Sequence, residues 1–150
     1  MIAHDYFLAG KVVAIFGATG FIGSHLAEAL LFSNCIVRAS GRYLPGLIPP
    51  HILSNHNFTL QKCDITDSHS VNLFLKDVDI VIHLASSSLP KDSNKFPHID
   101  VDTNLHGAIN ILDACIANHI HKFVFISSGG TVYGQPLQIP IPESHPTNPL

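Results

Sequence analysis

The hydrophobic positions of this 150-residue chain fall into short continuous runs separated by longer amphipathic stretches. Runs of four to six residues rich in Val, Ile and Phe predict strands that are buried on both faces. These predicted strands cover Val12–Phe16, Cys35–Ala39, Phe58–Lys62, Asp79–Leu84 and Lys122–Ser127.

Apolar residues spaced three and four positions apart predict helices between these strands. In the first helix this spacing places Ile22, Leu26, Ala29 and Leu30 on one face. Asp67 or Ser68 is suited to cap the second helix. The predicted helices cover Phe21–Phe32, Val71–Leu75 and Asp100–Asn118, and a loop with one short helix is expected over Gly41–Asn57.

Strands that alternate with helices predict an α/β fold, a Rossmann-like doubly wound parallel sheet covered on both faces. Ligands of such sheets bind outside the carboxyl ends of the strands, and polar clusters follow several of the predicted strands. We expect one domain over residues 1–134 and a proline-rich tail over residues 135–150.

Composition narrows the classes of function. Hydrophobic residues make up 46% of the chain and charged residues 13%, which argues against disorder. The formal net charge of −3 gives no reason to expect nucleic acid as a partner. The apolar runs are too short to predict a membrane span, and the first residues do not resemble a signal peptide.

Cysteine and histidine usage gives no sign of a metal site. Cys35, Cys63 and Cys115 are odd in number and form no Cys-x-x-Cys pair, so we expect reduced thiols in a cytoplasmic protein. The 11 histidines are scattered along the chain, and solvated or hydrogen-bonded imidazoles are the expectation at each.

Three glycines follow the first predicted strand and open the first predicted helix. Gly17, Gly20 and Gly23 stand three residues apart. A backbone without Cβ atoms can approach a pyrophosphate closely, and a helix N-terminus offers free N–H groups and the positive end of its dipole. This context predicts a dinucleotide site, although a purely structural corner is the alternative.

Five segments of the chain occur in one order: Gly17–Gly23, Asp64–Asp67, His83–Ser86, Asn104–Gly107 and Ser127–Gly134. Together they resemble the extended short-chain dehydrogenase/reductase family of nucleotide-sugar epimerases and dehydratases. The likeness is greatest to its UDP-glucose 4-epimerase-like branch and extends over residues 11–150. It implies the N-terminal, NAD(P)-binding portion of such an enzyme, with a truncated sheet and no substrate lobe.

The resemblance also implies which residues contact the cofactor. Asp64 would reach the adenine edge, with helix capping as its alternative role, and Asn104, on an otherwise apolar helix stripe, would need a hydrogen-bond partner. The residues implied are Gly17, Thr19, Gly20, Phe21, Ile22, Gly23, Ser40, Arg42, Asp64, Ile65, Leu84, Ala85, Ser86, Asn104 and Ser127.

The end of the second strand bears on the choice between NAD and NADP. An acidic residue there would bind the ribose 2′-hydroxyl and repel a 2′-phosphate, but the position is Gly41. Glycine leaves room, and the following Arg42 offers a guanidinium for a phosphate, so the sequence favours NADP. In the alternative, Arg42 stacks on adenine and the cofactor is NAD.

Catalysis in the family requires a Tyr-x-x-x-Lys pair and a Ser or Thr near the end of the fifth strand. Gly129 stands at the Ser/Thr position, so Ser128 and Thr131 are the substitutes, with capping of the turn as their alternative role. Tyr133 is followed four residues later by Leu137. We therefore expect these 150 residues to be inactive alone.

Two other functions stay open. One is a stand-alone NADP-binding module or sensor without catalysis, and the other is a reductase or dehydratase of the same family. The Thr-Asp-Glu triplet of the sugar dehydratases is absent before Tyr133, which disfavours a dehydratase. A nucleotide-sugar substrate is expected for the full-length parent, and a homodimer through the helix around Leu105–Ile116 is possible.

Overall fold

The structure is a computed structural model that describes residues 7–42, 44–86 and 94–149. These residues form a sheet of five strands in the order β3-β2-β1-β4-β5, and every neighbouring pair is parallel. The predicted parallel sheet is confirmed, with strand ends that differ from the prediction by one or two residues. The strands are β1 (Val12–Phe16), β2 (Ile36–Ser40), β3 (Phe58–Gln61), β4 (Ile80–His83) and β5 (Lys122–Phe125).

Helices connect the strands, as the alternating pattern predicts. The stretch expected as one long helix is composed of α5, a π-helical turn η1, and α6, and it begins three residues earlier than predicted. The helices are α1 (Phe21–Phe32), α2 (Pro50–Leu53), α3 (Ser68–Phe74), α5 (Pro97–Asp100), η1 (Val101–His106), α6 (Gly107–Ala117) and α7 (Gly129–Val132).

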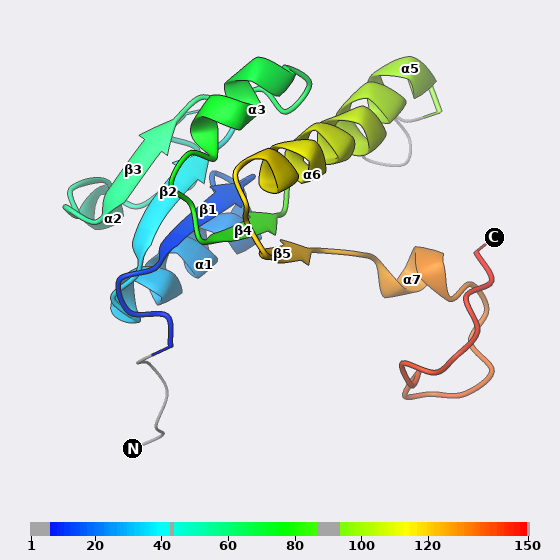
Figure 1. Ribbon diagram of the computed structural model, residues 1–150. Helices are drawn as coiled ribbons and strands as arrows, with labels where there is room; N and C mark the ends of the chain where they lie inside the picture. Colours follow the sequence, from blue (N-terminus) through cyan, green and yellow to red (C-terminus); the bar gives the residue numbers. More distant parts are fainter. Residues whose placement is uncertain (1–6, 43, 87–93, 150) are drawn as a thin grey trace.

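The two faces of the sheet are covered by different helices (Figure 1). Val13 and Ile15 of β1 belong to a core cluster with residues of α1 and α2. Ala14 and Phe16 belong to a second cluster with residues of α3 and α6. Because successive side chains of a strand point to opposite faces, this alternation gives the doubly wound architecture.

The predicted buried face of α1 is confirmed only in part: Leu30 is buried and Leu26 packs against the core, but Ile22 and Ala29 are exposed. The helix buries Gly23, Ser24, Ala27 and Leu30, whereas the side chain of Ile22 is 59% exposed. Small residues on the buried face let the helix axis approach the glycine turn and the sheet closely.

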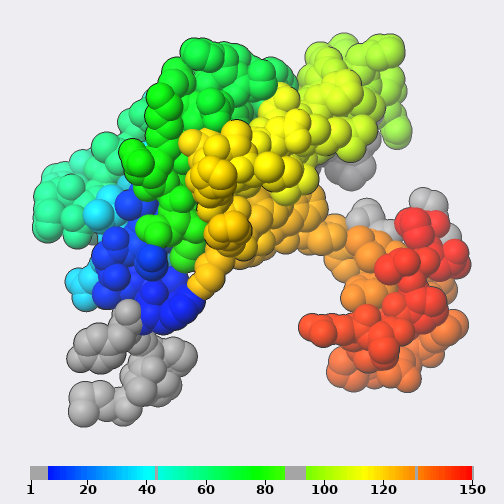
Figure 2. Space-filling model, in the orientation of Figure 1, coloured from blue at the N-terminus to red at the C-terminus, as the bar shows by residue number. Residues whose placement is uncertain are grey.

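The chain leaves the sheet after β5, which lies at its edge. Figure 2 shows residues 127–149, in orange and red, as a separate lobe beyond the body of the domain. Within this lobe His145 accepts a hydrogen bond from the Leu137 backbone N–H at 3.1 Å and packs edge-on against the Tyr133 ring. Among the described residues, every helix falls short of the length and apolar character needed to cross a bilayer.

Candidate nucleotide-binding site

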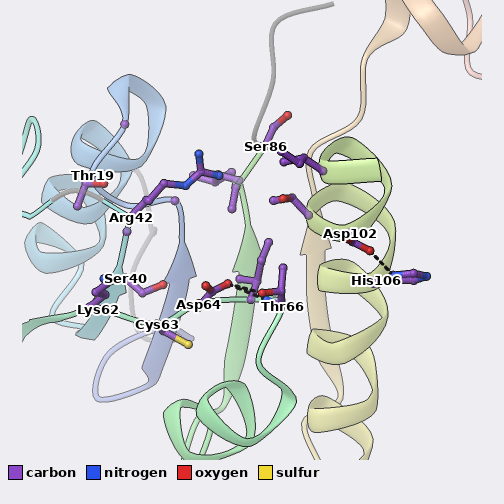
Figure 3. Close-up of a pocket in the computed structure, with 18 residues that line it drawn as sticks. Thr19, Ser40, Arg42, Lys62, Cys63, Asp64, Thr66, Ser86, Asp102 and His106 are labelled. Atoms are coloured by element: carbon purple, nitrogen blue, oxygen red, sulfur yellow. Dashed lines mark hydrogen bonds and ion pairs between the residues drawn. The ribbon is translucent and has the colours of Figure 1, made fainter. Parts of the chain in front are cut away.

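A cavity of about 970 Å³ opens at the carboxyl edge of the sheet (Figure 3). Its walls come from the segments that follow β1, β2, β3 and β4, and from α5 and η1. Several residues that sequence analysis assigned to a cofactor come together here. They are Gly17, Thr19, Gly20, Ser40, Arg42, Asp64, Ile65, Leu84, Ala85 and Ser86.

The glycine turn is built so tightly that two of its glycines have no room for a side chain. Gly17 has a φ of +84°, and a Cβ there would lie 2.8 Å from the Ala85 backbone nitrogen. A Cβ at Gly23 would lie 2.4 Å from the Gly17 carbonyl oxygen and 2.5 Å from the Ala18 Cα. The turn therefore brings the start of α1 against the ends of β1 and β4.

The N-terminus of α1 is left open to a ligand. Its N-cap residue is Gly20, no side chain caps the helix, and its first turn carries no acidic residue. The first N–H groups of a helix have no partner within the helix and attract anions. The turn thus offers a cradle for a phosphate group beside the cavity.

Polar groups at the other end of the cavity follow β2 and β3. Ser40 is buried, whereas Arg42 and Lys62 are exposed along the rim. At the cavity's β2 edge the backbone N–H groups of Gly17 and Ala18 both donate to the Ser40 carbonyl oxygen. These bonds hold the end of β2 against the glycine turn.

Asp64 accepts hydrogen bonds from the backbone N–H of Thr66 at 3.0 Å and from its hydroxyl at 2.8 Å. These two bonds, and to a smaller extent the charge of Arg42, hold the pKa of the Asp64 carboxyl below its usual value. Burial and the neighbouring carboxylates raise the pKa of the Cys63 thiol to about 11. The cavity therefore holds an ionised carboxylate and a neutral thiol at neutral pH.

Other predicted cofactor residues lie outside the cavity lining. Phe21 and Ile22 are 72% and 59% exposed on the first turn of α1, and Gly23 is buried beneath the glycine turn. Asn104 donates to the Asp100 carboxylate at 2.7 Å, so it has a hydrogen-bond partner as expected. Ser127 is exposed just beyond β5.

The two catalytic candidates lie in the segment after β5. Ser128 is exposed and precedes α7, whereas Thr131 lies within α7, with a side chain outside the described part of the structure. A Cβ at Gly129 would meet no atom within 4 Å, so a larger residue would fit at this position. Neither Ser128 nor Gly129 lines the cavity.

Sequence reasoning missed one wall of the cavity. Asp102, Thr103 and His106 of η1 line it, and His106 contacts the Asp102 carboxylate at 3.0 Å. Lys62, Cys63, Thr66 and Ile99 complete the set of unexpected lining residues. The rule that ligands bind at the carboxyl edge could have indicated η1, because the connection after β4 must begin at that edge.

Asn110 was also missed, although it connects two elements that flank the cavity. Its side-chain amide donates to the Ile65 backbone carbonyl at 2.9 Å. Nearby, a Cβ at Gly107 would lie 2.7 Å from the Ile65 side chain, so α6 packs closely on the loop after β3.

The cysteines are free thiols, and two of them, Cys35 and Cys115, are buried in the core as expected. Across residues 7–42, 44–86 and 94–149, no group of three His, Cys, Asp or Glu side chains is placed to hold a metal ion.

Comparisons with known proteins agree with this architecture. A UDP-glucose 4-epimerase of Lacticaseibacillus casei is 34% identical, over 91% of this chain and 42% of the relative. The Thermus thermophilus UDP-glucose 4-epimerase in complex with NAD superposes with a TM-score of 0.79 and 30% identity, covering 93% of this chain and 45% of that one. The Bordetella bronchiseptica enzyme WbmH in complex with NAD+ has a TM-score of 0.76 and 33% identity, covering 92% and 46%.

This chain thus spans less than half the length of these relatives. A family model matches residues 13–150, from the first strand through the glycine turn to the last residue. The chain belongs to the NAD dependent epimerase/dehydratase family.

Proposed function

We propose that this chain binds a nicotinamide dinucleotide along the carboxyl edge of its sheet. The observation that carries this proposal is the glycine turn, where Gly17 and Gly23 exclude any side chain and bring the uncapped start of α1 to the cavity. The pyrophosphate would lie at this turn, and the adenosine half would lie toward Asp64 and Arg42. Two related structures were determined with NAD, which supports the class of ligand.

We also propose that the chain is the cofactor-binding part of a nucleotide-sugar 4-epimerase in the cytoplasm. The support is the similarity to several UDP-glucose 4-epimerases. In such an enzyme the cofactor would supply reversible hydride transfer with a sugar carbon. The task of the residues described here would be to hold and orient it.

Our preferred cofactor is NADP. No carboxylate stands at position 41, and the Arg42 and Lys62 side chains are exposed at the cavity rim. Cations near the ribose would attract a 2′-phosphate, and the guanidinium of Arg42 suits it geometrically.

A titration of the purified 150-residue chain with NAD and NADP tests the proposed dinucleotide site and the proposed preference for NADP. We expect NADP to bind more tightly, and Arg42→Ala to weaken NADP about tenfold while leaving NAD within about threefold. Lys76→Ala, which removes an exposed cation outside the cavity lining, is the matched control. Absence of binding of either dinucleotide would refute the site, and NAD binding as tight as NADP would refute the preference.

We propose that these 150 residues do not catalyse epimerisation alone, because none of their tyrosines has a lysine four positions later. Incubation with UDP-glucose and either cofactor should give no UDP-galactose. A binding module or sensor is the second candidate, favoured by Gly129 at the position of the family's Ser or Thr. The coding sequence after Leu150 separates the two: continuation into Tyr-x-x-x-Lys supports the enzyme, and a stop codon supports the module.

We propose that the chain forms a homodimer through the outer face of η1 and α6. Apolar residues repeat along this face at intervals of three and four, and each is at least 42% exposed: Val101, Leu105, Ile109, Leu112 and Ile116. Ile109→Glu should shift the chain to monomer in sedimentation velocity. Phe32→Glu, at a 79% exposed residue on α1, should leave the oligomeric state unchanged.

A further inference from the structure

Thr19 in the glycine turn fills the space beside Gly41. A Cβ built on Gly41 would lie 2.0 Å from the Thr19 Oγ1, 2.6 Å from its Cγ2 and 2.8 Å from its Cβ. The loop after β2 also closes on the other side of this residue. A Cβ on Gly46 would lie 2.5 Å from the Thr19 Cβ, and the Leu47 backbone N–H donates to the Thr19 carbonyl at 3.0 Å.

Rotation of the Thr19 side chain cannot make room for a residue at position 41. Rotation about χ1 moves Oγ1 and Cγ2 but leaves Cβ in place, and Cβ alone is already too close. The backbone of Thr19 is fixed in turn by its bond to Leu47 and by the approach of Gly46. A side chain at position 41 would therefore have to displace either the glycine turn or the loop after β2.

The Thr19 hydroxyl is placed as a polar group of the cavity. Thr19 is half-buried and lines the cavity together with Ser40 and Arg42 (Figure 3). Within the described part of the chain, its hydroxyl forms no hydrogen bond. A hydroxyl can donate to a phosphate oxygen as well as to a sugar hydroxyl.

We propose that Thr19 is a specificity-determining residue for the dinucleotide and that it acts as a coupled pair with Gly41. The inference rests on the proposed function. Thr19 excludes a carboxylate from position 41, where an acidic side chain would accept a hydrogen bond from the ribose 2′-hydroxyl. In its place, the cavity presents the Thr19 hydroxyl and the Arg42 guanidinium, two donors that suit a phosphate on the ribose. A carboxylate that selects NAD can then stand at position 41 only when Thr19 also changes.

The test is a pair of double-mutant cycles on the 150-residue chain. Gly41→Ala adds a Cβ without charge, and it is combined with Thr19→Gly, which removes the three atoms nearest to that Cβ. Gly41→Asp adds the carboxylate and is combined with the same Thr19→Gly. Urea unfolding of the cofactor-free proteins gives the steric coupling, and titrations with NAD and NADP give the specificity.

We expect Gly41→Ala alone to raise the unfolding equilibrium constant about tenfold or more, and less than about threefold in the Thr19→Gly background. Gly41→Asp alone should weaken both dinucleotides. The Thr19→Gly/Gly41→Asp protein should bind NAD about tenfold or more tightly than NADP.

Two results would overturn the inference. One is that Gly41→Ala and Thr19→Gly are additive in unfolding; the other is that Gly41→Asp alone achieves the full preference for NAD. Either can occur while the unmodified chain still binds a dinucleotide, in which case the proposed function stands. Failure of the unmodified chain to bind NAD or NADP would instead overturn the proposed function, and the inference with it.

Discussion

Gly20 and Gly23 of the turn have separable roles, and substitution by alanine should distinguish them. Gly23→Ala places a methyl group 2.4 Å from the Gly17 carbonyl oxygen and 2.5 Å from the Ala18 Cα. Both obstacles are backbone atoms, so they cannot move as a flexible side chain would. At Gly20 an added Cβ meets only the Gly17 carbonyl at 3.5 Å, an ordinary contact, and φ is −85°.

The expected magnitudes differ accordingly. Overpacking costs about 1–3 kcal/mol, and contacts this short with backbone atoms place Gly23→Ala in the upper half of that range. Alanine is favoured over glycine inside a helix by about 0.5–1 kcal/mol, which offsets part of the cost. We expect Gly23→Ala to lower the free energy of unfolding by about 2 kcal/mol. Gly20→Ala should change it by less than about 0.5 kcal/mol.

For cofactor binding we expect the opposite order of effects, with Gly20→Ala the more damaging substitution. Gly20 lines the cavity, so its methyl group would enter the space assigned to the pyrophosphate, although the fold tolerates it. We expect Gly20→Ala to weaken dinucleotide binding about tenfold with unchanged urea unfolding. Urea unfolding without cofactor and calorimetric titration separate the two effects. The reasoning would be refuted if Gly23→Ala were as stable as the unmodified chain, or if Gly20→Ala bound dinucleotide with unchanged affinity.

Three further predictions concern residues that support the site. Asn110→Leu should destabilise the fold by about 1–3 kcal/mol in urea unfolding, because the Ile65 carbonyl loses its partner, and no change would contradict the bond. Asp67→Ala should lower the urea midpoint of unfolding, since the Asp67 carboxylate accepts from the His69 backbone N–H at the start of α3; Asp67→Asn should keep the midpoint close to that of the unmodified chain. His83 is 2% exposed and burial lowers its pKa, so the unfolded chain takes up the proton first and stability is lost as the pH falls below about 6.5, the pKa of an exposed histidine. His83→Leu should lessen that loss in thermal unfolding measured above and below this pH, and an identical pH dependence would contradict the assignment.

The parts of the fold that depend on local chemistry could be predicted from the sequence. The bounds of the first helix agree with α1, and Asp67 caps α3 as its position beside an apolar stretch indicates. The buried face of α1 could be predicted only in part. The apolar spacing identified Leu30, whereas packing against the sheet also selects the small residues Gly23, Ser24 and Ala27.

The same limit applies to the candidate site. Its walls from β1, β2 and β4 follow from the glycine turn and the strand ends, which sequence patterns mark clearly. The wall from η1 was missed because apolar spacing predicts a helix but not which of its polar residues line a cavity, and Asp102 and His106 are such polar residues. Likewise, glycine at position 41 shows only that a carboxylate is missing. The structure shows that Thr19 occupies the space, which no periodicity encodes.

Burial is the property that apolar patterning predicts least well in this chain. β1 (Val-Val-Ala-Ile-Phe) and β5 (Lys-Phe-Val-Phe) both carry apolar runs, and both form strands. β1 lies between β2 and β4 and under helices on both faces, so its last four residues are buried, whereas Val124 and Phe125 of β5 are 46% and 55% exposed. An apolar run therefore specifies a strand through its backbone preference and its fit to a neighbouring strand. Whether that strand is also covered depends on its place in the sheet order, which is set by the connections rather than by the run itself.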